Sequence, residues 1–297
     1  WIQNVITAIE RGIRRSEEAV KREIERLVTN TPGFEASVSL LLEYGDPNSL
    51  EFALQLAQYY PLPSLANFAK SRRGTDEQRM NAAQFASRHG LMSRSEPVTL
   101  IVKGEPREVL LLDFEIYTEP EDDGKPLPKA AQARLEAAHQ AGLEGDFARS
   151  ISEAAQGLAI APKSPVFLNH IAGALHHLNR HDEADAVNRR LGAEHPDYLF
   201  ARIAMADIAI REDRLDEAHQ WLDPLLARRR FHISEFRAVA LLYINYWRAK
   251  NEPTSAGYWI KLLDDIDPDS VTDDMRLLVS MSKILDGARK LMTKKKH

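Results

Sequence analysis

The chain has 297 residues, enough for one long repeat array or two domains, and its 44% hydrophobic and 28% charged residues exclude disorder throughout. The 39 basic and 44 acidic residues give a net charge of −5, which disfavours nucleic-acid binding because such proteins usually present a basic face. The absence of cysteine excludes disulfides, zinc–thiolate sites and cysteine nucleophiles.

The lack of cysteine also fits a reducing compartment, and no apolar run reaches the ~20 residues of a membrane span. We therefore expect a cytoplasmic protein that makes no membrane contact. The chain begins at Trp1 rather than methionine, so our expectations include an upstream segment.

Residues 1–96 are predicted to form a region of short helices. Apolar spacings of three, four and seven, together with breaking residues, predict helices over 2–28, 34–44, from Pro47 to Pro61, up to about Lys70, and over 76–89. Thr75 supplies an N-cap for the last of these. The succession over about 34–90 resembles a HEAT-type helical repeat array at Arg79, Ala82, Ala83 and Gly90, residues that ordinary helix packing also explains.

Two β-rich segments, 98–102 and 109–117, predict one β-hairpin insertion over about 97–118. A two-stranded hairpin is marginal alone, so its apolar face must lie on the helices or on a partner. Its exposed edges make it a second candidate for interaction. A polar, proline-rich linker follows, so we place a hairpin and linker at 97–129 and a helical solenoid at 130–297.

A period of about 34 residues organises the C-terminal half, and a period in this range indicates stacked helical hairpins. Pro162 and Pro196 lie one such period apart, as do Ala184 and Ala218, whereas the interval from Ala218 to Ala256 is longer by about one helical turn. In three units a small residue precedes a proline by the same interval: Ser150 and Pro162, Ala184 and Pro196, and Ala256 and Pro268. We expect the small residue where two helices touch and the proline where the second helix has ended.

These units resemble the tetratricopeptide repeat (TPR) family over about residues 131–268, at Gly145-Asp146-Phe147, Ala159-Ile160-Ala161-Pro162, Asp182-Glu183-Ala184 and His195-Pro196. The expected fold is therefore all-α: an α-solenoid of TPR-like hairpins, preceded by the helical N-terminal region. A helix over 271–292 is expected to cap its end. Pro224 should kink the third unit. The longer interval is expected to arise in the arginine-rich connection 228–232, which should make the stack irregular.

The resemblance implies a groove, lined by the first helix of each hairpin, that holds a peptide or a partner helix. If Leu168, Ala172 and Leu175 face the core, polar neighbours face the groove. The partner-binding candidates are Asn169, His176, His177, Asp207, Arg211, Asn245 and Arg248. Such groups can hydrogen-bond an extended backbone and pair with carboxylates. A solvated helix face is the alternative interpretation.

No catalytic residue, metal site or cofactor is predicted. The imidazoles of His176, His177 and His181 suit zinc, but a turn separates them and no glutamate follows His177. Phosphate-binding, dinucleotide-binding and serine-nucleophile motifs are absent from the sequence. Short arginine clusters are interpreted as solvated faces.

We therefore expect a non-catalytic protein-interaction adaptor or scaffold. One alternative is a regulatory or substrate-recruiting arm of a larger enzyme or complex whose N-terminal part lies upstream. A second alternative is a nucleic-acid-binding helical repeat protein.

Overall fold

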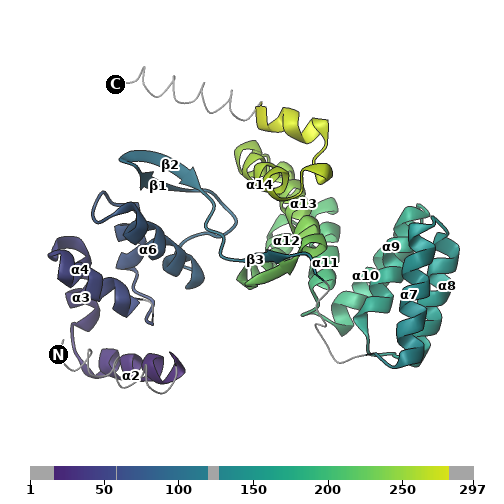
Figure 1. Cartoon of the computed structure of the whole chain (residues 1–297), viewed down its shortest axis with the longest axis horizontal. Coiled ribbons are helices and arrows are strands. Elements are labelled where there is room, and N and C mark those ends of the chain that lie inside the picture. The colour runs from purple at the N-terminus through teal and green to yellow at the C-terminus, as the bar shows by residue number, and fades with distance from the viewer. Residues whose placement is uncertain (1–16, 58, 120–126, 281–297) are drawn as a thin grey trace. The chain divides into compact units, whose positions relative to one another are not determined.

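The computed structural model describes residues 17–280, apart from residue 58 and residues 120–126. The chain divides into two compact units, Trp1–Asp113 and Phe114–His297. Both are built mainly of helices that pack against their neighbours in the chain (Figure 1). No helix within the described part is both long and apolar enough to cross a membrane. The predicted helices over 2–28 and 271–292 lie partly outside the described residues.

Five helices make up the described helical part of the first unit: α2 (Glu17–Asn30), α3 (Phe34–Tyr44), α4 (Pro47–Ala57), α5 (Ser64–Lys70) and α6 (Asp76–Arg88). Their apolar stripes meet in one core, where Ile24, Val38 and Leu56 are fully buried. Thr75 caps α6 as predicted, because its hydroxyl accepts the backbone N–H of Gln78 at 3.1 Å.

A buried arginine ties α6 to the chain around it. Arg79 is only 5% exposed. Its guanidinium donates to the carbonyl oxygens of Ile101 at 3.1 Å, Arg73 at 3.0 Å and Gly74 at 2.7 Å, and pairs with Asp76. Arg79 is one of the residues on which the HEAT-type resemblance rests, and these contacts give it a structural role.

The predicted hairpin is present, and its apolar face lies on the helices of the first unit. β1 (Val98–Val102) pairs antiparallel with β2 (Glu105–Val109), and Leu100 is buried in the helical core. The predicted second arm over 109–117 was wrong. Lys103 and Gly104 both have positive φ, which forms a two-residue turn that places Glu105 opposite Val102 and ends the ladder at Val109.

The end of that predicted arm, from Phe114 onward, belongs to the second unit. β3 (Glu115–Tyr117) pairs in parallel with β4 (Arg230–His232), and the Glu115 N–H donates to the Arg229 carbonyl at 2.8 Å. Phe114 packs edge-on against Phe231, with ring centroids 5.3 Å apart. A single apolar strip in the sequence therefore serves two separate sheets.

The second unit is a succession of helical hairpins formed by α7 (Lys129–Leu143), α8 (Phe147–Ile160), α9 (Pro165–His177), α10 (His181–Glu194), α11 (Leu199–Arg211), α12 (Leu215–Leu222), α13 (Ile233–Ala249) and α14 (Pro253–Ile266). Consecutive helices pack together, an arrangement that fits a solenoid. The predicted contact residues Ser150, Ala184 and Ala256 are all buried. Helices α8, α10 and α14 each have 14 residues and end just before the predicted prolines.

The repeat is visible in the backbone. One residue in the turn within each hairpin has positive φ: Gly145, Asn179, Asp213 and Asn251. The first three follow at the regular period, and the last comes about one helical turn late. The sequence interpretation placed the extra residues in the arginine-rich connection, and this was wrong.

The extra residues lengthen a helix. Helices α9 and α11 have 13 residues and α13 has 17, while the starts of all three keep the regular period. A whole added turn, about 3.6 residues, keeps the same helix face on the core. The stack therefore absorbs the insertion without a change in which side chains are buried.

Pro224 changes the type of helix where it occurs. Helix α12 ends at Leu222 and continues as the 3-10 helix η1 (Asp223–Ala227), with Pro224 near its start. At the predicted kink the chain therefore changes from an α-helix to a 3-10 helix, because proline has no N–H to continue the α-helical hydrogen bonds. The connection that follows forms β4 instead of an irregular loop.

Candidate interaction groove

The first helices of two successive hairpins, α7 and α9, lie side by side and enclose a pocket with the start of α8. Its volume is about 250 Å³. It is lined by Ala138, His139, Gly142, Leu143, Phe147, Ser150, Asn169, His170, Gly173, Ala174 and His177. Glycine and alanine make up much of the wall, and a Cβ added at Gly173 would meet no atom within 4 Å. The small residues therefore create the space.

Three imidazoles give this pocket its chemistry. His177 stacks flat on Phe147, with ring centroids 4.4 Å apart and 6° between the planes. His139 and His170 meet edge to face at 6.2 Å. Burial, reinforced by the charge of His139, lowers the pKa of His170 below its ordinary value of 6.5. The shift favours the neutral form of His170, which offers both a donor and an acceptor beside the amide of Asn169.

Of the seven predicted groove residues, the structure brings Asn169 and His177 into this pocket. His176 instead meets the ring of His181 at 4.9 Å, at the exposed turn between α9 and α10. His177, Arg211 and Asn245 occupy the same position in α9, α11 and α13, because the starts of these helices follow the regular period. All three positions are exposed.

Two of the charged candidates, Asp207 and Arg211, form ion pairs within the chain. The Arg211 guanidinium reaches Asp207 at 3.0 Å and Asp185 of α10 at 2.7 Å, and the bond with Asp185 raises its pKa. Arg211 therefore joins two hairpins. Asn245 and Arg248 are exposed on α13, and Arg248 has no counterpart in the shorter helices α9 and α11.

Sequence reasoning missed the α7 side of the pocket, His139 and Gly142, and the stacking ring Phe147 at the start of α8. It also missed His170. The available signal was the run of small residues at Ala137, Ala138 and Ala141, which predicts thin packing. Only the structure shows that this thin packing lies opposite the polar face of α9.

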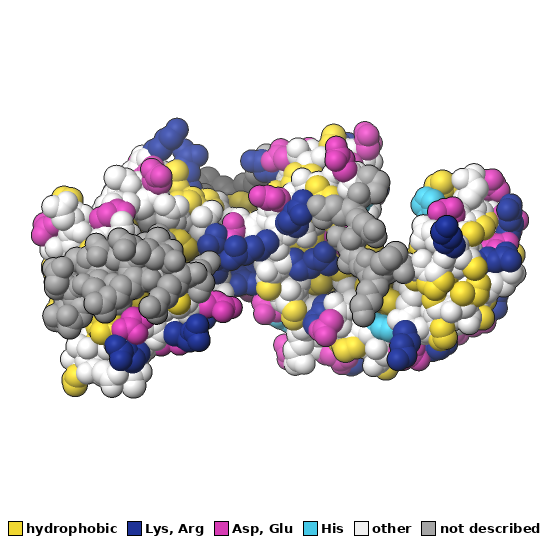
Figure 2. Space-filling view, turned by 60° about the horizontal axis from the view of Figure 1, so that its bottom comes forward, with side chains coloured by type: hydrophobic (Ala, Val, Ile, Leu, Met, Phe, Trp, Pro, Cys, Tyr) yellow, Lys and Arg dark blue, Asp and Glu magenta, His cyan; other side chains and the backbone are white. Residues whose placement is uncertain are grey.

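Metal binding and nucleic-acid binding were the alternative interpretations of the histidines and of the short arginine clusters. The described residues hold no group of three or more histidine, aspartate or glutamate side chains placed to bind a metal ion. In two of the short arginine clusters, 189–190 and 228–230, Arg189 pairs with Glu212, Arg190 with Glu194, and Arg228 with Glu235. On the face drawn in Figure 2, basic side chains stand beside acidic ones on both units.

The architecture is compatible with a helical repeat array, and it carries a small antiparallel hairpin. No protein-family model matches the chain, and no curated protein matches it either.

Proposed function

We propose that the second unit is a TPR-type interaction module, a non-catalytic adaptor or scaffold that binds an extended peptide of a partner protein across α7 and α9. The observation that carries the proposal is the pocket between the first helices of two successive hairpins. Repeat arrays commonly bind partners on such surfaces. A regulatory arm of a larger complex would use the same surface for another subunit.

The side chains of the pocket suit an extended backbone, which presents donors and acceptors alternately. The Asn169 amide and the neutral His170 ring each offer a donor and an acceptor. Leu143, 71% exposed at the edge of the pocket, provides an apolar contact for a partner side chain. The small wall residues let the partner approach the helix backbones closely.

The test is to select binders to the chain from a random peptide library and to measure their affinity for two variants. Gly173→Leu adds a side chain at the pocket wall, and nothing lies within 4 Å of its added Cβ. Ala155→Leu adds a similar side chain on the exposed face of α8, outside the pocket, and serves as the control. We expect Gly173→Leu to weaken binding at least about tenfold, which is about 1.4 kcal/mol, and Ala155→Leu to leave it unchanged. If every selected peptide binds Gly173→Leu as tightly as the wild type, the groove is not the binding surface.

A further inference from the structure

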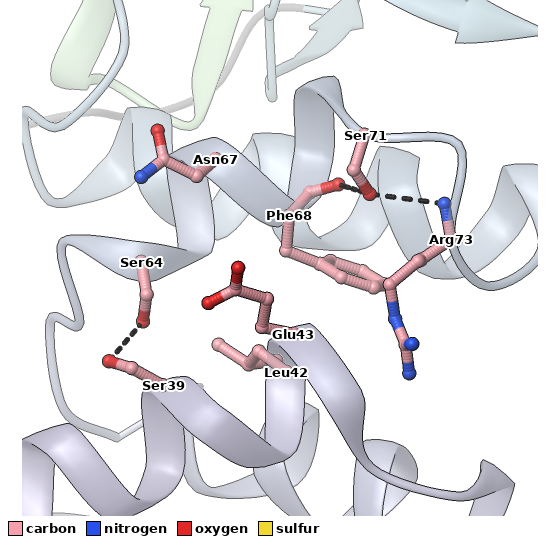
Figure 3. Close-up of a pocket in the computed structure, with 8 residues that line it drawn as sticks. All are labelled: Ser39, Leu42, Glu43, Ser64, Asn67, Phe68, Ser71 and Arg73. Carbon is pink, nitrogen blue, oxygen red and sulfur yellow. Dashed lines mark hydrogen bonds between the residues drawn. The ribbon is translucent and has the colours of Figure 1, made fainter.

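The first unit contains a second cavity, independent of the proposed groove. It lies between α3 and α5, has a volume of about 250 Å³, and is drawn in Figure 3. It is lined by Ser39, Leu42, Glu43, Ser64, Asn67, Phe68, Ser71 and Arg73. These residues come from separate segments of the chain, so no local motif reveals the site.

The cavity combines an apolar floor with polar walls. Leu42 and Phe68 are 1% and 4% exposed and provide the apolar surface. The Ser39 hydroxyl donates to the Ser64 hydroxyl at 2.9 Å, which leaves the Ser64 proton for another acceptor. The Asn67 amide is exposed and makes no hydrogen bond to another described residue. A ligand here would meet both kinds of surface.

Two opposite charges line this cavity without neutralising each other. Figure 3 shows the Glu43 carboxylate directed into the space beside Ser64. This carboxylate accepts a hydrogen bond from the Tyr44 hydroxyl at 2.8 Å, and no cation among the described residues forms an ion pair with it. The Arg73 guanidinium points toward the end of α3, where its Nη2 donates to the Gly45 carbonyl at 2.7 Å.

The Arg73 side chain also carries an unsatisfied donor. Its Nε is buried and has no hydrogen-bond partner in the described part of the chain. Water cannot reach this atom either, so the guanidinium group that a ligand can meet is the terminal Nη1, which makes no hydrogen bond to another described residue. The cavity therefore has an anionic group on one wall and a guanidinium donor on another.

We infer that this cavity binds a small zwitterion with an apolar body, of amino-acid or dipeptide size. The ligand ammonium pairs with Glu43, its carboxylate accepts from Arg73, and its apolar part lies on Leu42 and Phe68. The volume supports a ligand of this size, because pockets for drug-sized molecules begin at about 300 Å³. A free amino acid and the end of a short peptide share this chemistry and differ in the separation of their charges.

The test is an NMR chemical-shift titration of the full chain with four compounds. L-Leucine and glycyl-L-leucine carry both charges, 3-methylbutylamine lacks the carboxylate, and 4-methylpentanoate lacks the ammonium. We expect the better zwitterion to bind with a dissociation constant of about 1 mM or lower, and both singly charged analogues to bind at least about tenfold more weakly. Preference for leucine identifies a free amino acid as the ligand class, and preference for the dipeptide identifies a peptide.

Glu43→Gln and Glu77→Gln provide the matched variants. Both remove one exposed carboxylate from the first unit, but Glu77 lies on α6 and does not line the cavity. We expect Glu43→Gln to weaken zwitterion binding about tenfold and Glu77→Gln to leave it unchanged. Saturable binding by neither zwitterion, equal binding of the singly charged analogues, or an unaffected Glu43→Gln variant would each overturn the assignment. None of these results bears on the groove of the second unit.

Discussion

Replacing Arg79 with methionine should destabilise the first unit while leaving the second unit unchanged. The side chain is almost fully buried and donates to three backbone carbonyl oxygens, those of Ile101, Arg73 and Gly74. Methionine fills a similar volume but donates nothing. Buried charged groups can sometimes be replaced by apolar ones without loss, when both partners are removed together. Here the partners belong to the backbone and remain, so the loss should persist.

The magnitude follows from these contacts. Hydrogen bonds from a charged donor are worth about 1.5–3 kcal/mol each, and the desolvation of the guanidinium offsets several kcal/mol of that sum. The pair with Asp76 adds about 0–1 kcal/mol, because the Asp76 side chain is 44% exposed. We expect a net loss of about 3 kcal/mol for Arg79→Met. Arg79→Lys should lose about half as much, because an ammonium has three donors in place of five.

Urea unfolding with two probes is the assay. Three of the four tryptophans, Trp221, Trp247 and Trp259, lie in the second unit, so their fluorescence reports mainly on it, whereas far-ultraviolet circular dichroism reports on both units. With a urea dependence of about 1–2 kcal/mol/M, the first-unit midpoint should fall by about 1.5–3 M in Arg79→Met. The fluorescence midpoint should not change. A methionine variant as stable as the wild type, or an equal shift in both probes, would refute the reasoning.

Three further predictions concern the second unit. A Cβ at Gly157 would lie 2.2 Å from the Phe167 ring, so Gly157→Ala should lower the free energy of unfolding by about 1–3 kcal/mol. Gly173→Ala should raise the free energy of unfolding by up to about 1 kcal/mol, because alanine has the higher helix propensity. Denaturant unfolding of both variants measures the two changes. Burial lowers the pKa of His170, so the unfolded state binds a proton before the folded state does as pH falls below 6.5, and the free energy of unfolding should decrease. The decrease should be smaller in His170→Gln, which denaturant unfolding above and below that pH would measure. Burial raises the pKa of Tyr198 from 10.0 to about 12, so stability should decrease as pH rises above 10, and absorbance titration should show one late tyrosinate that Tyr198→Phe removes.

Much of the helical architecture could be predicted from the sequence because its determinants are local. A helix needs apolar residues at spacings of three and four, a cap such as Thr75, and a proline beyond its end. The small residues Ser150 and Ala184 could be placed at helix contacts because their spacing to the following proline repeats. The same local rules predicted a hairpin, since β-rich segments flank a turn at Gly104.

Contacts between residues far apart in the chain were decided only by the tertiary structure. Residues 115–117 suit a strand in any register, and their pairing with β4 depends on residues in a distant part of the chain. The extra turn of α13 preserves the buried face, so periodicity alone cannot distinguish a longer helix from a longer connection.

The candidate sites show the same division. Helical periodicity predicted the polar face of α9 and grouped Asn169 with His177, and both residues line one pocket in the structure. The ion pair between Arg211 and Asp185 could not be predicted in this way, and neither could the presence of Glu43 and Arg73 at one cavity. A helix period specifies which side chains point the same way, whereas the residues that face them from another helix depend on how the helices pack.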